Sequence, residues 1–294
     1  MTKKALIIGA VFVDIIVNVP NIPKSGGDVT AKMKNLSVGG CAFNVYGATR
    51  YALNKNKVDL FVPVGNGQYA KSVRETMIKE DIPILVEDNR LDNGWDLCLV
   101  EPSGERSFIT VPGIEQKFST SWFTKFNLSD YKYIYLSGYE LENTYSAIKI
   151  LDYLEKRNAD AQIFFDASPR IAHLDTRIID RLLSPGTIIN ANSDEIGILS
   201  SKNSIEEQAI EIFNKTQSPV LITLGSSGCF SFDKTGGKLI PASKVGKVVN
   251  TIGAGDTHCG GVIAGLLKGY SLNDACLLGN RLSSLVIQQE SGSL

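Results

Sequence analysis

Histidine and cysteine are scarce in this chain of 294 residues. The two histidines, His173 and His258, are too few and too far apart in the sequence for a histidine-based metal site. The five cysteines are odd in number and scattered, and none has C-x-x-C spacing, so neither a disulfide framework nor a zinc site is indicated. We therefore expect a reduced, cytoplasmic protein.

An excess of charge of either sign is also missing, because 30 Lys and Arg side chains face 31 Asp and Glu side chains. This balance offers no electrostatic surface for nucleic acid or for an anionic membrane. No apolar run approaches the ~20 residues of a membrane span, and Asp14 interrupts the apolar stretch near the N-terminus. We expect a small-molecule substrate and neither nucleic acid nor membrane as a partner.

Three frequent catalytic motifs are absent as well. There is no G-x-S-x-G nucleophile elbow, although residue counts alone leave a Ser-His-Asp hydrolase open. No G-x-x-x-x-G-K-[ST] loop occurs, and no G-x-G-x-x-G follows the first apolar run. The last absence argues against a nucleotide-dependent oxidoreductase on a doubly wound sheet, which we keep as an alternative.

What the chain does have is an alternation of short apolar runs and segments of helical periodicity, with 43% hydrophobic and 21% charged residues. The expected strands are 5–10, 59–65, 133–138, 161–167, 187–192 and 219–225. The expected helices are 42–53, 68–80, 144–156, 176–183, 193–199, 205–215, 256–268 and 272–289. This order predicts an α/β protein with a three-layer, mostly parallel central sheet and helices on both faces.

Two segments interrupt the alternation. Residues 96–111 are two β-rich runs around P-S-G-E, a hairpin signal, and residues 13–38 contain strands and loops without a helical pattern. Together they predict a small antiparallel sheet outside the main one. It acts either as a lid that excludes water or as a plain edge extension, and the residues leave both open. No repeat or linker is visible, so we expect a single domain over residues 1–294.

The stretch 250–261 places Gly253, Ala254 and Gly255 directly before Asp256, at the start of an expected helix. N–H groups at a helix N-terminus lack intrahelical acceptors and, with the helix dipole, favour a bound anion. Small residues let a phosphate approach the backbone, and Asp256 would lie beside it as a base for an incoming hydroxyl. This arrangement suits phosphoryl transfer. The alternative is a glycine-rich turn with Asp256 as the N-cap.

A second constellation lies at residues 37–53. Gly39 and Gly40 precede an expected helix, and Asn44 falls on its first turn, where its amide can donate and accept hydrogen bonds. Asp14, just after the first strand, adds a carboxylate suited to sugar hydroxyl groups. Asn44 has an alternative interpretation as a helix-start residue that bonds only locally.

The motifs G-G-C-A-F-N (39–44) and N-T-I-G-A-G-D-T-H-C-G-G (250–261), about 210 residues apart, resemble the two signatures of the ribokinase-like (PfkB) family of carbohydrate kinases. Further landmarks follow in the family's order: F-D-A-S-P-R (165–170), N-S-D-E (192–195), T-L-G-S-S-G (223–228) and Asn280. The resemblance covers essentially the whole chain. It implies a ribokinase-like fold whose lid, formed by about 13–38 and 96–111, also makes a homodimer interface.

The resemblance also implies roles for particular residues. Asp256 is similar to the catalytic base, and its three predecessors are similar to the anion hole, namely Gly253, Ala254 and Gly255. The substrate-binding positions are matched by Asp14, Gly39, Gly40 and Asn44. The positions that contact ATP are matched by Asn192, Thr223, Gly225, Ser226, Gly228 and Asn280. Glu195 matches the residue that acts near a hydrated Mg²⁺.

Two departures from the family pattern bear on cofactor and substrate. Asn250 stands where members usually carry Asp, and in members activated by a monovalent cation that acid helps to hold the ion. The change argues against K⁺ as a cofactor. Cys41 stands where ribose-specific members often carry Lys, which weighs against ribose itself.

The leading hypothesis is an ATP-dependent sugar kinase that transfers the γ-phosphoryl group to a hydroxymethyl group of ribose, fructose or a related small sugar. A nucleoside kinase of the same family is an alternative. A non-catalytic sensor of sugar or nucleotide is an alternative of another class. The presence of Asp256, Asn44 and Glu195 argues against the sensor, because a sensor has no need of a base.

Overall fold

The computed structural model of the protein describes residues 3–53 and 55–294. Its contacts divide the chain into two compact units. The first unit holds the segment that ends at Gly9 together with Cys41–Phe61 and Phe118–Leu294, and the second holds Ala10–Gly40 and Val62–Lys117. The second unit is therefore larger than the lid segments expected from the sequence.

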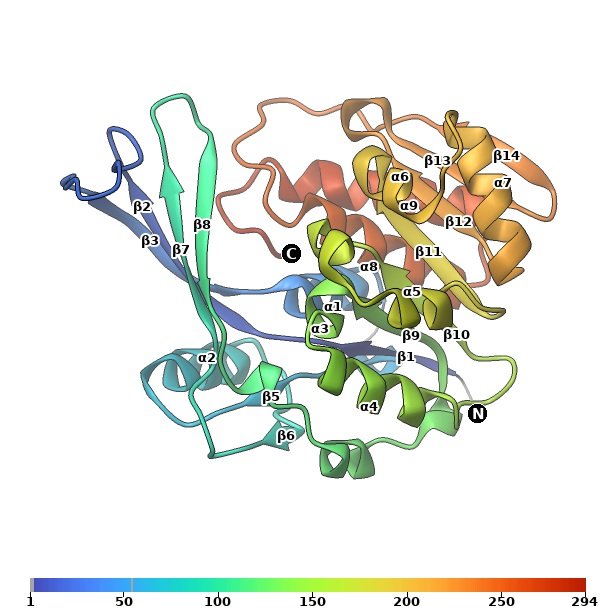
Figure 1. Cartoon of the computed structure of the whole chain (residues 1–294), viewed down its shortest axis with the longest axis horizontal. Coiled ribbons are helices and arrows are strands. Elements are labelled where there is room, and N and C mark those ends of the chain that lie inside the picture. Colours follow the sequence, from blue (N-terminus) through green and yellow to red (C-terminus); the bar gives the residue numbers. More distant parts are fainter. Residues whose placement is uncertain (1–2, 54) are drawn as a thin grey trace. The chain divides into compact units, whose positions relative to one another are not determined.

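Within the described residues of the first unit, eight strands form one sheet in the order β14-β13-β12-β11-β10-β9-β1-β4 (Figure 1). The strands are β1 (Lys4–Ile8), β4 (Val58–Phe61), β9 (Tyr131–Ser137), β10 (Gln162–Asp166), β11 (Thr187–Asn192), β12 (Val220–Thr223), β13 (Cys229–Asp233) and β14 (Gly236–Ile240). All pairs from β4 to β12 are parallel, whereas β13 and β14 add antiparallel strands at one edge.

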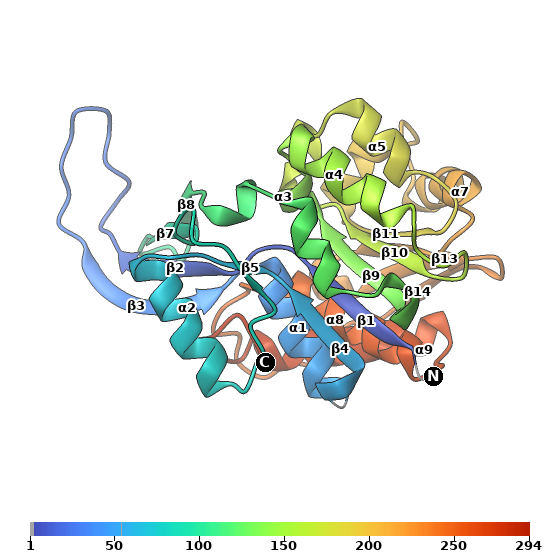
Figure 2. The ribbon, with the colours of Figure 1, turned by 90° about the horizontal axis from the view of Figure 1, so that it is seen from below.

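Helices cover both faces of this sheet. Figure 2 shows α1 (Cys41–Ala52), α8 (Ala254–Leu267) and α9 (Leu272–Val286) on one face, and α4 (Thr144–Leu154), α5 (Thr176–Leu182) and α7 (Ile205–Thr216) on the other. The short helices α3 (Gly138–Leu141) and α6 (Ser193–Leu199) follow β9 and β11. The three-layer, mostly parallel α/β fold predicted from the sequence is confirmed.

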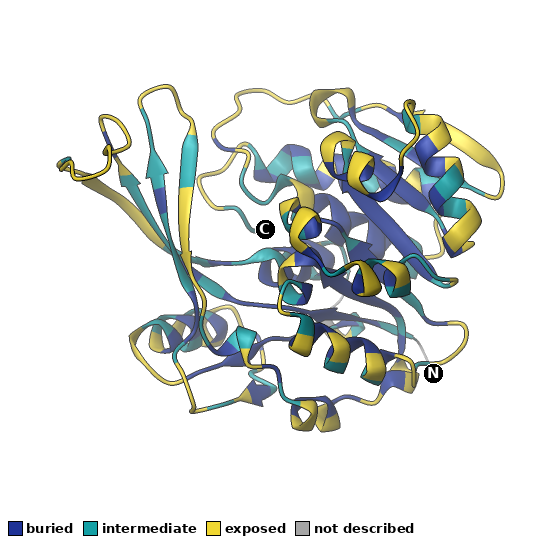
Figure 3. Cartoon of the chain, viewed as in Figure 1, coloured by how far each residue is buried: buried dark blue, intermediate teal, exposed yellow. Residues whose placement is uncertain are grey.

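The strands are buried because helices occupy both sides, as Figure 3 shows for the central strands. Ile7, Ile134, Phe164 and Ile188 are among their fully buried side chains. Such continuous apolar runs are typical of a doubly covered parallel sheet.

Glycines let α8 pack closely against α1 and α9. A Cβ added to Gly260 would lie 2.6 Å from the Val45 carbonyl oxygen of α1, and one added to Gly261 would lie 2.6 Å from Cα of Gly279 in α9. Both glycines therefore allow backbone approach that no larger residue permits. This packing fixes the first turn of α8 relative to the first turn of α1.

The second unit is built on a four-stranded sheet with the order β3-β2-β7-β8. Its elements are β2 (Phe12–Asn18), β3 (Lys32–Gly39), β5 (Pro63–Val64), α2 (Gln68–Lys79), β6 (Val86–Glu87), β7 (Trp95–Val100) and β8 (Arg106–Val111). The hairpin predicted around P-S-G-E is confirmed as the antiparallel pair β7–β8. The prediction of a wholly antiparallel small sheet is wrong, because β2 and β7 pair in parallel. Their connection is a long crossover rather than a turn, and local sequence does not encode such a pairing.

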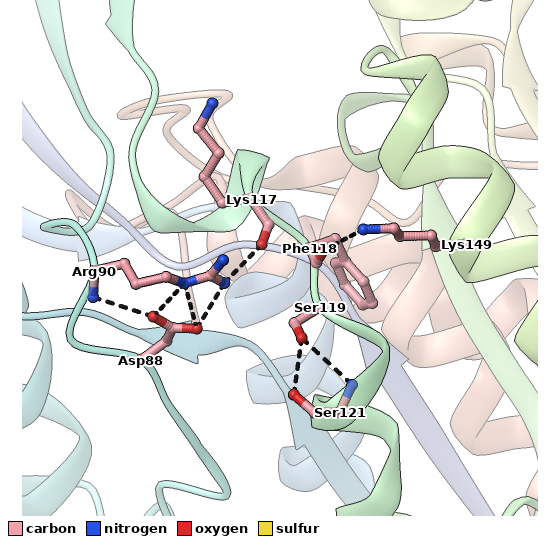
Figure 4. A network of polar contacts seen from close by, with 7 residues as sticks. All are labelled: Asp88, Arg90, Lys117, Phe118, Ser119, Ser121 and Lys149. Atoms are coloured by element: carbon pink, nitrogen blue, oxygen red, sulfur yellow. Dashed lines mark hydrogen bonds and ion pairs between the residues drawn. The ribbon is translucent and has the colours of Figure 1, made fainter.

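The chain passes from the second unit to the first between Lys117 and Phe118. Figure 4 shows that each of these two residues is hydrogen-bonded to a residue of its own unit. In the second unit Arg90 donates to the Lys117 carbonyl at 3.0 Å and pairs with Asp88. In the first unit Lys149 of α4 donates to the Phe118 carbonyl at 3.4 Å. The carbonyls of Lys117 and Phe118 thus each accept a hydrogen bond from a basic side chain of their own unit.

Short 3₁₀ helices complete the described secondary structure: η1 (Lys55–Lys57), η2 (Ile114–Gln116), η3 (Thr120–Lys125), η4 (Leu128–Asp130), η5 (Pro169–His173) and η6 (Gly225–Ser227). Strands β13 and β14 and helix α3 had no counterpart among the expected elements. Helix α9 ends at Val286, three residues before the expected end. Within residues 3–53 and 55–294 no helix has the length and apolarity that a membrane crossing requires.

Candidate active site

Asp256 lies in the first turn of α8, as its third residue. The N-cap of this helix is Gly253, whose φ of 72° is left-handed, and no side chain caps the helix. The alternative in which Asp256 merely caps the helix is therefore wrong. Its carboxylate is free for other contacts at an end of the helix where the N–H groups lack intrahelical acceptors.

The contact of Asp256 that defines the site comes from α1. Asn44 donates from Nδ2 to Asp256 Oδ2 at 2.8 Å, across 212 positions of the sequence. The side chain of Asn44 is 5% exposed, and its Oδ1 atom accepts no hydrogen bond from the described residues. Asn44 therefore does not bond only locally, and its orphaned acceptor fits a hydroxyl donor supplied by a ligand.

Cys41, the first residue of α1, makes a second hydrogen bond to Asp256 through its thiol. Burial raises the pKa of the Cys41 thiol well above its usual value, and the negative charge of Asp256 adds to the rise. The thiol thus stays protonated and donates to the carboxylate. The sequence identified Cys41 only as a departure from the family pattern, because a lone cysteine carries no signal of its partner.

The electrostatics of Asp256 suit a proton acceptor. Burial raises the pKa of Asp256 to about 6, while the hydrogen bonds from Asn44 and Cys41 act in the opposite direction. A carboxylate with this pKa is mostly ionised at pH 7 and still binds a proton far better than an exposed Asp. These are the properties of an effective general base near neutral pH.

Two further carboxyl groups lie near Asp256, and the sequence analysis assigned neither to the site. Burial raises the pKa of Glu140 to about 7 and that of Asp166 to about 6, and the charge of Asp256 adds to both. Glu140 follows β9 and Asp166 ends β10, so both stand at the carboxyl edge of the parallel sheet. The rule that ligands bind at this edge was the signal that could have found them.

Hydrogen bonds fix both carboxyl groups in place. Glu140 accepts from the Ser137 hydroxyl at 2.6 Å in a capping box at the start of α3. Asp166 accepts from Asn190 Nδ2 at 2.7 Å and from the Tyr135 hydroxyl at 3.3 Å. These hydrogen bonds fix the orientation of both carboxyl groups.

The proposed anion hole is open and small. Gly255 is exposed, and a Cβ added to it would meet nothing within 4 Å. The Ala254 N–H donates weakly, at 3.3 Å, to the Thr251 carbonyl. The backbone of the first turn of α8 can thus be reached by an anion next to Asp256.

In the second unit, the residues predicted to bind substrate gather at the start of β2 and the end of β3. A Cβ added to Gly39 would lie 2.4 Å from Asp14 Oδ2, and Gly40 has a left-handed φ of 103°. Asp96 of β7 is the cross-strand neighbour of Asp14 and forms a side-chain hydrogen bond with it. Burial raises the pKa of Asp96 to about 6. Asp96 is therefore a second acidic group that the sequence analysis missed.

The predicted nucleotide positions follow β11 and β12. Asn192 caps α6 by accepting from the N–H groups of Asp194 and Glu195, both at 2.9 Å. Thr223 ends β12, and the turn after it contains three more of the predicted residues, Gly225, Ser226 and Gly228. Asn280 of α9 is buried and donates to the carbonyls of Ile240 and Pro241. Its amide nitrogen is thus used inside the protein.

Glu195 is the predicted contact of Mg²⁺. Its Oε2 atom accepts from the Asn192 N–H at 2.9 Å, and burial raises the pKa of its carboxyl to about 7. No cluster of three or more His, Cys, Asp or Glu side chains suited to a metal occurs in the described part of the chain. Mg²⁺ is commonly bound by one or two carboxylates together with substrate phosphates and keeps several of its water ligands. A single carboxylate such as that of Glu195 fits this kind of binding.

Comparison with known proteins shows that the chain is a carbohydrate kinase. The chain matches the model of the pfkB family carbohydrate kinase over residues 2–294 and belongs to that family. It is 31% identical to the uncharacterized sugar kinase YegV of Escherichia coli K12, over 99% of this chain and 90% of YegV. It is 26% identical to the adenosine kinase of Saccharomyces cerevisiae, over 86% of this chain and 78% of that protein.

Two solved structures show the same fold. The ribokinase of Thermotoga maritima has a TM-score of 0.83 at 21% identity, with 99% of this chain and 95% of the other covered. The ribokinase of Arabidopsis thaliana, solved with ribose and ATP, has a TM-score of 0.81 at 21% identity, covering 99% and 94%. The family predicted from the two sequence motifs is confirmed.

Proposed function

We propose that the protein is an ATP-dependent kinase that phosphorylates a hydroxymethyl group of a small, uncharged sugar. The observation that carries the proposal is the pair formed by Asn44 and Asp256 at the open N-terminus of α8. It combines a base, an orphaned hydrogen-bond acceptor and an anion-binding backbone. The ATP and ribose bound by the Arabidopsis ribokinase support the choice of both substrates.

In the proposed reaction, Asp256 accepts the proton of the substrate hydroxyl as its oxygen attacks the γ-phosphorus of ATP. The bond from this phosphorus to the bridging oxygen of ADP breaks, and the electron pair leaves with ADP. The N–H groups of Gly253, Ala254 and Gly255 stabilise the charge that develops on the transferred group. Glu195 would be the side chain that holds a hydrated Mg²⁺ at this site, and the ion would supply positive charge to the phosphates of ATP.

The charges around Asp256 indicate the substrate class. Two acidic groups in the first unit, Glu140 and Asp166, are close enough for the charge of Asp256 to act on them. Arg170 is paired with Glu142 at 3.4 Å. Asp166 and Asp256 are mostly ionised at pH 7 and would repel a phosphate or carboxylate on the substrate, which disfavours its binding. As a separate part of the proposal, Asp14, Gly39 and Gly40 of the second unit bind neutral hydroxyl groups of the substrate.

A nucleoside kinase is the second candidate, favoured by the similarity to the yeast adenosine kinase. A release assay for ADP, run with ATP and Mg²⁺ against neutral sugars, sugar acids, sugar phosphates and nucleosides, separates the candidates. We expect turnover with a neutral sugar and its loss in Asp256→Asn. Turnover only with a sugar acid or sugar phosphate would contradict the charge argument. Binding of ATP without any turnover would favour the sensor.

We also propose that the β7–β8 hairpin covers the bound sugar and that the small sheet forms a homodimer. Its two edge strands expose apolar side chains, namely Met33, Leu36, Phe108, Ile109 and Val111. Exposed apolar edge strands are prone to pair with another chain. Sedimentation equilibrium tests the dimer. Protection of residues 96–111 from proteolysis by sugar and nucleotide tests the cover, and equal cleavage with and without them would contradict it.

A further inference from the structure

The last described residues of the chain pack against the loop that leads into α8. A Cβ added to Gly253 would lie 1.9 Å from the Gly292 carbonyl oxygen. One added to Gly292 would lie 2.8 Å from Cγ2 of Ile252. The backbones of residues 252–253 and 292 are thus in direct contact, and the position of Gly253 depends on this C-terminal segment.

Asn250 ties the two segments together. Its side chain is 8% exposed, donates from Nδ2 to the Glu290 carbonyl at 2.9 Å and accepts at Oδ1 from the Ile252 N–H at 2.6 Å. The Ile287 carbonyl also accepts from the N–H groups of Val249 and Asn250. The orientation of the amide is fixed by its partners, because a carbonyl requires a donor and an N–H requires an acceptor.

This arrangement does not fit a monovalent cation at residue 250. Such an ion is held by oxygen atoms, for example backbone carbonyls that replace its hydration shell. Asn250 directs N–H, not oxygen, at the Glu290 carbonyl, and its own oxygen is already bonded to Ile252. The neutral amide also lacks the charge of the Asp that the family pattern has at this position.

We propose that Asn250 is a positioning residue that does by hydrogen bonding what a bound cation would do by coordination. It holds the C-terminal segment against Gly253 and so keeps the first turn of α8 in place without K⁺ or Na⁺. The catalytic consequence rests on the proposed function of Gly253–Gly255 as the anion hole. The structural consequence is that this loop stays ordered without alkali cations, and it does not depend on that function.

The variant Asn250→Asp tests the proposal because it changes one atom. A carboxylate oxygen would replace Nδ2 and face the Glu290 carbonyl oxygen in a nearly buried place. Two acceptors repel each other there unless a cation or a proton comes between them. The matched control is Asn143→Asp, at the exposed N-cap of α4, where Asp is as good a cap as Asn.

The melting temperature and the kinase rate are measured in KCl, NaCl and tetramethylammonium chloride at equal ionic strength and pH 8. For the wild type and for Asn143→Asp we expect the same values in all three salts. For Asn250→Asp in tetramethylammonium we expect a melting temperature about 3 °C lower or more. We expect its kcat to fall about tenfold through misplacement of the anion hole. Potassium or sodium should restore much of both losses.

Three results would overturn the proposal. These are activation of the wild type by K⁺ or Na⁺, insensitivity of Asn250→Asp to the choice of cation, and wild-type behaviour of that variant in tetramethylammonium. The melting temperatures need no substrate, so they remain informative if no kinase activity is found. Should Asn250→Asp not fold, the cation series on the wild type still decides the question.

Discussion

Replacement of Asp256 by Asn should abolish most of the activity and yet stabilise the protein at alkaline pH. The side chains have the same size, and the Asn44 N–H keeps an oxygen to donate to. The variant cannot accept the proton of the substrate hydroxyl, so kcat should fall by about 10²–10⁴. Binding of ATP and sugar should change little, because neither depends on this proton transfer.

The gain in stability follows from the pKa of Asp256, which burial raises from 3.8 to about 6. Since the folded pKa is above the unfolded one, ionisation opposes folding. The contribution of Asp256 to the free energy of unfolding is therefore undiminished below about pH 4, is lost as pH rises to about 6, and is constant above that. At pH 8 the cost is about 2 pKa units at about 1.4 kcal/mol each, or about 3 kcal/mol. At pH 5 it is about half of that.

Urea unfolding of the wild type and of Asp256→Asn at pH 5 and pH 8 measures this difference. We expect the variant to gain about 1.5 kcal/mol more at pH 8 than at pH 5. Asp274→Asn is the matched control, because Asp274 is the third residue of α9 and is exposed. There the loss of a favourable charge at a helix N-terminus should destabilise by about 0.5 kcal/mol, with full activity.

Near-normal turnover of Asp256→Asn would refute its assignment as the base. A stability change of the same sign and size at both pH values would refute the argument from burial. It would instead indicate that the carboxylate acts mainly on the helix terminus. Turnover and stability are measured independently, so the assignment of the base and the argument from burial can each be refuted while the other stands.

Three further predictions follow from the same site. Gly253→Ala should be much less stable and less active than Gly269→Ala. Both glycines have a positive φ, but only a Cβ at residue 253 would meet a carbonyl oxygen, at 1.9 Å. Equal urea midpoints of the two variants would contradict this prediction. Cys41→Ala should raise the pKa of Asp256 by roughly half a unit and so shift the acid limb of the kcat/KM profile to higher pH. Cys41→Ser keeps a hydrogen-bond donor and should not shift it. Identical pH profiles of Cys41→Ala and the wild type would show that the thiol does not act on the base. Asn44→Ala should shift the acid limb of kcat/KM to higher pH by about one unit, because Asp256 loses a hydrogen-bond donor. It should also raise KM, because the substrate loses the acceptor Oδ1. An unchanged KM would contradict the role of Asn44 in substrate binding.

The sequence anticipated most of the main sheet and the helices beside it. Runs such as those of β9 and β11 are apolar throughout because helices cover both faces of the sheet, and this pattern is visible without coordinates. The first turn of α8 was found for a similar reason, since Gly253 and Asp256 mark a helix start locally. The edge strands β13 and β14 were missed because they are only five residues long and neither is a continuous apolar run: β13 alternates buried and half-buried residues at its start, and the first four residues of β14 are exposed.

The parallel pairing of β2 with β7 had no local signal. The two strands are joined through a long connection, and nothing in either strand specifies its neighbour or the direction of pairing. For the same reason nothing in the sequence indicated that Asp96 is the cross-strand neighbour of Asp14, although both lie in segments that were predicted to belong to the small sheet.

By itself, the sequence determined which segments form strands and helices, and which two motifs carry the chemistry, because periodicity and glycine placement are local properties of the chain. Only the tertiary structure decided the partners of each polar group. Asn44 meets Asp256 across 212 positions, and Asn250 meets the carbonyl of Glu290 across 40. A hydrogen bond requires two atoms within about 3 Å, and only the packing of the folded chain sets such distances between remote residues.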